Sequence, residues 1–227
     1  MFDSIDKIMT YFSAVCTESF KYKRKTYIPK DLRVSTHIFR GVDCVVNCGA
    51  CCKRYSLDYL PSEKHPYELE KRLIQIGSTK FTIYSDLQPE AHDNCSHLDM
   101  STGRCKIYPN RAFSCDFELI RFLHTNIPNK PTQLLTKLYG RKWNMTRCDG
   151  GLGGLCKILP CSIEIKNDII RKFTRLKEWA DYFKIPTCLP EIITYINTGP
   201  HPEPFVLNIS KKEEITNTWF VKGGINE

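Results

Sequence analysis

Apolar residues near the start of the chain recur at three- and four-residue steps, which is the spacing of one face of an α-helix. The pattern predicts a helix over residues 3–24, capped by Asp3 or Ser4, and Pro29 prevents its continuation. Cys16 lies within the apolar stripe, so we expect a buried core thiol there. The stripe consists of Ile5, Ile8, Met9, Phe12, Val15, Cys16 and Phe20.

The middle of the chain carries shorter patterns. Residues 66–77 predict a short helix, with Leu69, Leu73 and Ile76 facing inward and Gly77 as its C-terminal stop.

Three further segments complete the expected middle. Phe81 and Ile83 alternate with polar residues and predict a short strand over 80–86. Residues 110–124, which follow a proline, and 132–140, which end in a glycine, are expected to form short helices.

The last third of the chain has the clearest helical pattern. Ser162 is placed to cap a helix that continues through Phe183. After Pro186 the pattern is broken often, through residues 198–205, and residues 217–227 read as a final strand or a docked arm. The stripe of this helix consists of Ile165, Ile169, Phe173, Leu176, Ala180 and Phe183.

Together these elements predict an α+β protein with a small, irregular, metal-organised core and flanking helices at both ends. We expect three segments. Residues 1–40 form an N-terminal helix and basic linker, 41–161 a cysteine-cluster metal-binding domain, and 162–227 a C-terminal helix and tail packed on the core.

Composition narrows the class of protein. The chain has 227 residues, 41% hydrophobic and 26% charged, which is ordinary for a globular protein. The start of the chain lacks a signal-peptide pattern and no apolar run is long enough for a membrane span, so we expect a cytoplasmic protein that does not enter the membrane. In that reducing compartment, twelve cysteines favour metal or redox chemistry over disulfides.

The net charge of +8 is partly local. Residues 20–33 carry six basic side chains with two tyrosines and a phenylalanine between them, and residues 171–179 form a second basic patch. Such patches bind phosphates, so nucleic acid is one candidate partner through 20–33. The alternative is the solvated face of a mildly basic protein, and the sequence identifies no other substrate or partner.

Four cysteines fall within nine positions in the sequence "CVVNCGACC". Cys48 and Cys51 form a C-x2-C pair around Gly49, a spacing that aims two thiolates at one metal. Cys52 follows Cys51 directly, and adjacent side chains point in different directions. The pair therefore serves two nearby metals or reaches a larger cluster. Cys44 lies four positions before Cys48.

Further along the chain stand four more candidate ligands, which bring the thiols to eight. Eight thiolates suit two tetrahedral zinc sites, or one iron–sulfur cluster and a zinc-like site. We favour an iron–sulfur cluster over zinc because two of the thiols are adjacent and no histidine ligand is evident. The complete predicted ligand set is Cys44, Cys48, Cys51, Cys52, Cys95, Cys105, Cys115 and Cys148.

The order of these motifs resembles the YkgJ-type cysteine-cluster proteins, a zinc- or iron-chelating domain family. Cys44 stands one residue too far from Cys48, Ala112 replaces the usual proline and Asp116 the usual arginine. The resemblance implies metal or cluster binding, and its relatives similar to flagellin lysine N-methylases suggest methyl transfer. The matching residues are Cys48, Gly49, Cys51, Cys52, Cys95, Cys105, Ile107, Tyr108, Arg111, Cys115, Cys148, Gly150 and Gly153.

Some alternatives stay open. Cys156 or Cys161 could replace Cys44, His97 could be a ligand or a neighbour of the site, and Cys188 reads as structural. Two functional classes remain. One is a redox or group-transfer enzyme of the methylase-like kind. The other is a zinc-stabilised binding module that contacts nucleic acid or an acidic protein partner.

Overall fold

The computed structural model describes a large part of the chain and places its helices and strands. The described residues are 12, 15–22, 25–28, 31–34, 36–39, 41–43, 57–65, 67–76, 78–86, 95–113, 115, 123–125 and 157–209. Two long helices and several small antiparallel sheets lie within them, which confirms the α+β class.

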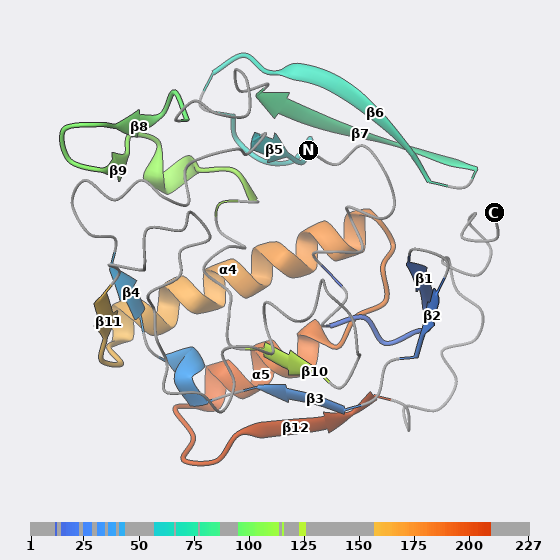
Figure 1. Ribbon diagram of the computed structural model, residues 1–227, viewed down its shortest axis with the longest axis vertical. Helices are drawn as coiled ribbons and strands as arrows, with labels where there is room; N and C mark the ends of the chain where they lie inside the picture. Colours follow the sequence, from blue (N-terminus) through green and yellow to red (C-terminus); the bar gives the residue numbers. More distant parts are fainter. Residues whose placement is uncertain are drawn as a thin grey trace.

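The elements follow one another along the chain in a mixed order (Figure 1). They are β1 (Phe20–Tyr22), β2 (Lys25–Tyr27), β3 (Asp31–Val34), η1 (Thr36–Phe39), β4 (Gly41–Asp43), β5 (Leu57–Tyr59), β6 (Glu70–Ile76), β7 (Thr79–Asp86), β8 (Leu98–Asp99), β9 (Arg104–Cys105), η3 (Tyr108–Asn110), β10 (Leu123–Thr125), β11 (Lys157–Leu159), α4 (Ile163–Tyr182), α5 (Leu189–Thr198) and β12 (Phe205–Asn208).

Helix α4 runs through the middle of the molecule, between two layers (Figure 1). On one side lies a three-stranded antiparallel sheet in the order β5-β7-β6. On the other side lie α5 and a second antiparallel sheet in the order β10-β3-β12. The short ladders β8–β9 and β4–β11 occupy the end of the molecule near the start of α4.

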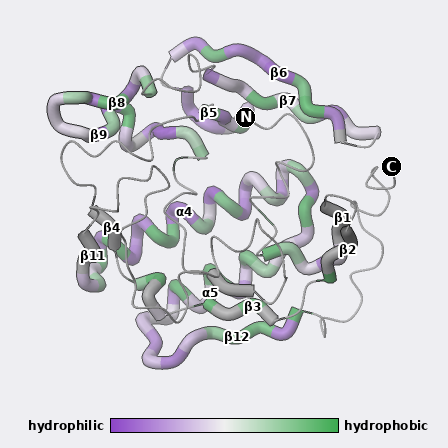
Figure 2. Tube along the Cα trace, viewed as in Figure 1, coloured by the Kyte–Doolittle hydropathy of each residue, from purple (hydrophilic) through white to green (hydrophobic). Residues whose placement is uncertain are grey.

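Helix α4 forms where the sequence predicts it. The Ser162 hydroxyl accepts a hydrogen bond from the backbone N–H of Ile165 at 3.2 Å, which satisfies one of the free amides of the first turn. Phe173, Leu176 and Ala180 of the predicted stripe are buried. Apolar and polar segments alternate along the helix (Figure 2), as expected of an element that packs on one side and meets solvent on the other.

The strand predicted over 80–86 is also confirmed as part of β7. Phe81 is 6% exposed and Ile83 is fully buried, so every second residue faces α4. The Phe81 ring lies 5.3 Å from the Phe183 ring, centroid to centroid. Tyr182 fastens the helix to the strand, because its hydroxyl donates to the Thr82 carbonyl at 2.6 Å and accepts from the Thr82 amide at 3.0 Å.

The helix predicted over 66–77 is wrong, because most of this segment is strand β6. Its seven residues pair with β7 from Glu70↔Ser85 to Ile76↔Thr79. Ile74 is buried while Leu73, expected to face inward, is 65% exposed. A strand alternates its side chains between two faces, so pairing with β7 fixed which apolar residues face α4.

The helix predicted over 3–24 is wrong in its second half. Phe12 is helical, but Cys16 forms a bridge with Thr187, and residues 20–22 are strand β1, paired with β2. The backbone amide of Cys188 donates to the Val15 carbonyl at 2.9 Å. These bonds to a distant segment replace the next helical turn. Residues 1–11 lie outside the described residues.

Three other segments also differ from expectation or lie outside the description. The helix predicted over 110–124 cannot reach its end, since 123–125 is strand β10 in the sheet with β3. Helix α5 and strand β12 occupy the region that was expected to be broken often. Residues 132–140 and 217–227 lie outside the described residues.

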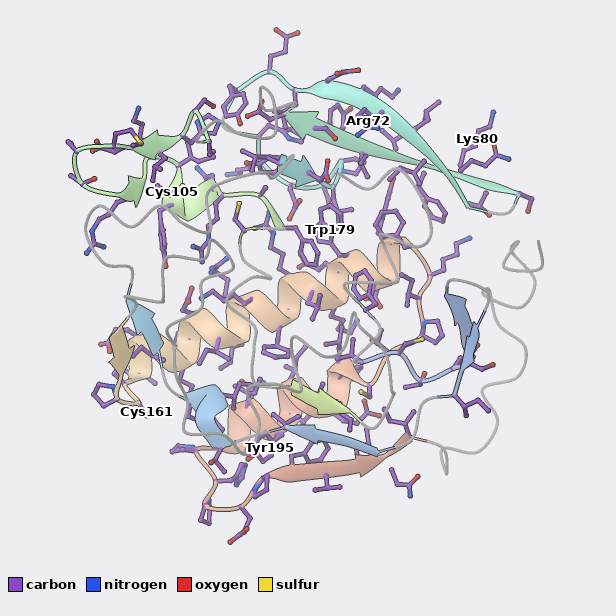
Figure 3. All side chains as sticks on the ribbon, viewed as in Figure 1. Arg72, Lys80, Cys105, Cys161, Trp179 and Tyr195 are labelled. Carbon is purple, nitrogen blue, oxygen red and sulfur yellow. The ribbon has the colours of Figure 1, made fainter. Side chains whose placement is uncertain are left out.

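The described core has one large and one small part. The large cluster joins buried residues of α4, α5, β3, β6 and β7, including the completely buried Trp179. Figure 3 shows Trp179 on the side of α4 that faces the β5-β7-β6 sheet. The small cluster has three buried residues, Leu57, Tyr59 and Ala112. The division into three segments at residues 40 and 161 stays a prediction.

Candidate metal centre

The small cluster gathers two of the predicted ligands from different parts of the chain. Cys95 and Cys115 are half-buried and pack against Leu57, Tyr59 and Ala112. Strand β5 supplies Leu57 and Tyr59, and the turn before Cys115 supplies Ala112, whose carbonyl accepts from the Cys115 amide at 3.1 Å.

A hairpin brings Cys105 towards Cys95. Strands β8 and β9 pair with Leu98 opposite Cys105, and the amide of Lys106 donates to the His97 carbonyl at 2.8 Å. Gly103 turns the chain, with a positive φ of 67° that other residues rarely adopt. Figure 3 shows Cys105 at this end of the molecule.

The surroundings of Cys95 raise the pKa of its thiol, and the backbone partly offsets that rise. Burial is the largest cause, and the negative charges of Cys105 and Asp86 add to it, while hydrogen bonds from the backbone amides of His97 and Leu98 lower the pKa. The turn is closed by the Leu98 amide, which donates to the Cys95 carbonyl at 2.9 Å. Amides directed at a sulfur favour its thiolate form, which is the form that binds metals.

Tyr59 lies between the two thiol-bearing segments. Burial raises its pKa, and the negative charge of Cys115 adds to that rise. Its hydroxyl donates to the Asn110 carbonyl at 3.1 Å, which fixes the ring against the turn that leads to Cys115. Of the three predicted ligands that the structure describes, Cys95 and Cys115 therefore pack on this small cluster, and Cys105 lies on the neighbouring strand β9.

His65 lies next to this cluster, although no sequence pattern had indicated it. Its ring lies 5.6 Å from the Tyr59 ring and 4.7 Å from the Tyr84 ring, and Tyr84 also packs on the small cluster. Among the described residues, its buried Nδ1 atom has no hydrogen-bond partner. His65 and Cys95 are thirty positions apart, so no local spacing could have revealed this.

The His97 ring is held by two side chains. Its Nε2 atom lies 3.0 Å from Asp86 Oδ2 and 2.6 Å from the Tyr67 hydroxyl, which itself hydrogen-bonds to Asp86. Burial, followed by the hydrogen bond to Asp86, raises the pKa of Tyr67. A carboxylate on one ring nitrogen fixes the orientation of the imidazole, as it does for histidines in metal sites.

The remaining predicted ligands lie outside the described residues: Cys44, Cys48, Cys51, Cys52 and Cys148. Each of the six described cysteines carries a reduced thiol. Within the described ranges, no three His, Cys, Asp or Glu side chains are arranged to hold a metal ion by themselves. The predicted set of eight therefore stays a prediction.

Three cysteines outside the predicted set have clear surroundings. Cys16 and Cys188 are completely buried in the large cluster, as expected of core thiols, and burial raises the pKa of Cys16 to about 12. Cys161 is exposed beside β11 (Figure 3). In the β4–β11 ladder Lys157 pairs with Asp43 at one end and Leu159 pairs with Gly41 at the other. Cys161 follows Leu159, so it lies at the end away from Asp43. Cys156 is outside the described residues.

The two basic patches differ in structure. Within the stretch over 20–33, residues 20–22 and 25–27 pair as strands β1 and β2, and residues 31–33 belong to β3. The patch over 171–179 lies on α4, where its cations meet carboxylates. These ion pairs are Arg171–Asp168, Lys172–Asp168, Arg175–Glu63 and Lys177–Asp181.

Cysteine thiols from separate segments, with amides directed at one sulfur, are typical of metal-chelating domains. Residues 43–149 match the CxxCxxCC family, described as "Putative zinc- or iron-chelating domain". The match confirms the resemblance and covers a little under half of the sequence. Neither a curated protein nor a solved structure matches the chain significantly.

The helices offer no membrane span. In the described part of the chain, neither α4 nor any other helix is both long and apolar enough to cross a bilayer.

Proposed function

We propose that this is a metal-binding protein that holds an iron–sulfur cluster, or zinc, through the eight predicted cysteines. The observation that carries the proposal is that Cys95 and Cys115 pack against the small cluster around Tyr59, inside the matched region, while the β8–β9 hairpin carries Cys105 towards Cys95. All three donors are sulfur, which suits both zinc and iron–sulfur clusters.

The described residues fit such a group. Two backbone amides stabilise a thiolate at Cys95, and the buried His65 Nδ1 gives the site one more unsatisfied polar atom. Zinc would hold the thiolates together, whereas an iron–sulfur cluster would also exchange an electron. The chain's own part is to gather the thiols, to stabilise their charge with amides and to shield them with Tyr59.

The metal also serves the stability of this end of the molecule. Among the described residues, the small cluster has three buried members and the large one twenty-four, so the described apolar burial is much smaller here. Metal binding to thiolates supplies about 10–16 kcal/mol in small zinc domains, comparable to the stability of a whole domain. We therefore expect metal removal to unfold the region around Tyr59 before it affects α4.

Anaerobic purification followed by metal and acid-labile sulfide analysis tests the proposal. Iron with sulfide and a brown colour that bleaches with dithionite supports a cluster, and colourless protein with zinc supports zinc. Cys95→Ser and Cys51→Ser should lower metal content and melting temperature, with Cys161→Ser as the control for an exposed thiol. Protein that binds neither metal, or a Cys51→Ser variant with unchanged metal and melting, contradicts the proposal.

Two roles are compatible with this centre. A redox or group-transfer enzyme of the methylase-like kind requires saturable binding of S-adenosylmethionine, which equilibrium dialysis measures. A zinc-stabilised binding module would use the basic β1–β2 hairpin, and its affinity for nucleic acid would fall steeply with salt. The hairpin is the observation that favours the module, since four basic residues lie within its eight positions.

A further inference from the structure

A cleft lies beside α4, next to the small cluster, because Asn110 and Arg111 line it and directly precede Ala112. Its volume is about 410 Å³, within the range of small-molecule sites. One wall is a single face of α4, and the other is formed by the loop after β5 and the turn at the end of η3. The lining residues are Ser62, Glu63, Lys64, Asn110, Arg111, Arg171, Thr174, Arg175 and Glu178.

The floor of the cleft is fixed by a buried ion pair. Glu63 Oε1 accepts from Arg175 Nε at 2.5 Å and from Trp179 Nε1 at 3.3 Å, and its Oε2 accepts from the Leu60 amide at 2.7 Å. Another nitrogen of Arg175 donates to the Arg111 carbonyl at 2.7 Å. Since three donors already engage Glu63, its charge is compensated within the protein, and the floor is rigid.

The remaining charged groups of the cleft are mostly positive. The Arg111 guanidinium is held 4.2 Å above the Tyr108 ring. Lys64 is exposed and has no ion-pair partner among the described residues, while Arg171 is exposed and shares Asp168 with Lys172. Glu178 is the opposing carboxylate at the rim. The cleft therefore presents a net positive charge to a ligand.

We propose that this cleft binds a small ligand through an oxyanion, either a phosphate or a carboxylate group. Lys64 and Arg171 contact the anion from opposite walls, and the hydroxyl groups of Ser62 and Thr174 add hydrogen bonds. Guanidinium groups suit both anions because their N–H groups form a planar fork. Arg111 and Arg175 hold the walls at a fixed separation, so little conformational entropy is lost when the ligand binds.

Calorimetric titration of the purified, metal-loaded full-length protein tests the proposal. Inorganic phosphate and glutarate are titrated separately at constant ionic strength, and the tighter of the two identifies the class of anion. Lys64→Ala and Arg171→Ala should each weaken binding about tenfold, as expected for one charge-assisted hydrogen bond. Glu178→Gln should tighten it by about two- to fivefold, because a repelling charge is removed from an exposed site.

Lys177→Ala is the matched control. It removes the same charge from the same helix, but Lys177 pairs with Asp181 and does not line the cleft. Unchanged affinity in this variant, with losses in the two cleft variants, supports the site. If neither anion binds saturably, or if all three cation variants lose affinity equally, the cleft is not an oxyanion site and the proposal is overturned. Circular dichroism of each variant checks that its fold is intact.

Discussion

Glu63 connects the loop after β5 to helix α4, and its replacement tests how the two halves of the molecule are joined. Glu63→Ala removes the acceptor for Arg175, Trp179 and the Leu60 amide together. The Glu63 and Arg175 side chains are only 13% and 14% exposed, so water cannot replace the lost partner fully. Breaking a buried pair on one side costs roughly 3–5 kcal/mol.

We take the low end of that range, about 3 kcal/mol, because both side chains keep some contact with solvent. For a chain of this size the melting temperature should fall by about 6–12 °C. In urea the midpoint should move down by roughly 1–1.5 M with an unchanged slope. Glu63→Gln keeps an acceptor and should lose about half as much free energy.

Urea unfolding followed by circular dichroism provides the measurement, and Glu178→Ala is the control. Glu178 is an exposed glutamate on α4, the helix that Glu63 contacts, so its loss should change stability by less than about 0.5 kcal/mol. A Glu63→Ala loss no larger than the Glu178→Ala loss would refute the assignment of Glu63 as the link between the loop and α4. A double-mutant cycle with Arg175→Ala then measures the coupling directly.

Other variants test the large cluster. Ile192→Ala in α5 should cost about 2–5 kcal/mol, because Ile192 is completely buried; a cost under 1 kcal/mol in urea unfolding would mean that α5 packs loosely. Gly199→Ala should cost about 1–3 kcal/mol, since its Cβ would lie 2.2 Å from Cζ of the buried Phe39, and an unchanged melting temperature would contradict this contact. At pH 8 iodoacetamide should label the exposed Cys161 in the folded protein, but Cys16 only after unfolding, because burial raises the pKa of Cys16 to about 12. Peptide mass spectrometry identifies the labelled cysteine. The contribution of the neutral Cys16 thiol to stability is complete below pH 9.0 and is lost progressively as pH rises towards 12. In Cys16→Val, the free energy of unfolding should therefore depend less on pH in that window. The same dependence in both proteins would show that Cys16 does not contribute.

Local sequence patterns correctly predicted α4 and β7, because the residues that specify each element lie within that element. Helix α4 has a capping serine, helical spacing over twenty residues and no internal glycine or proline, so no competing structure suits it. Strand β7 alternates cleanly, and its predicted inward residues are buried. Helix α5 was predictable in principle, since Pro190 opens it and the buried Ile192 and Ile196 are four residues apart.

Where a segment carried two competing local patterns, pairing with another part of the chain selected one of them. Residues 70–76 contain apolar residues at helical spacing and also an alternating pattern, and a hairpin with β7 selected the strand. The pair Gly77–Ser78 between the two strands is a hairpin signal that supports this outcome. The helix near Phe12 ends because the Val15 carbonyl accepts a hydrogen bond from the Cys188 amide and Cys16 forms a β-bridge with Thr187.

The sequence by itself determined where the cysteines stand, and their number and spacing match a domain described as "Putative zinc- or iron-chelating domain". It also determined α4 and β7, whose periodic patterns need no information from elsewhere. Only the tertiary structure decided that His65 lies beside Tyr59, that Glu63 bonds to Arg175, and that a cationic cleft opens next to α4. The Glu63–Arg175 contact joins residues 112 positions apart. Contacts of this kind depend on how sheets and helices pack, and no local spacing encodes that packing.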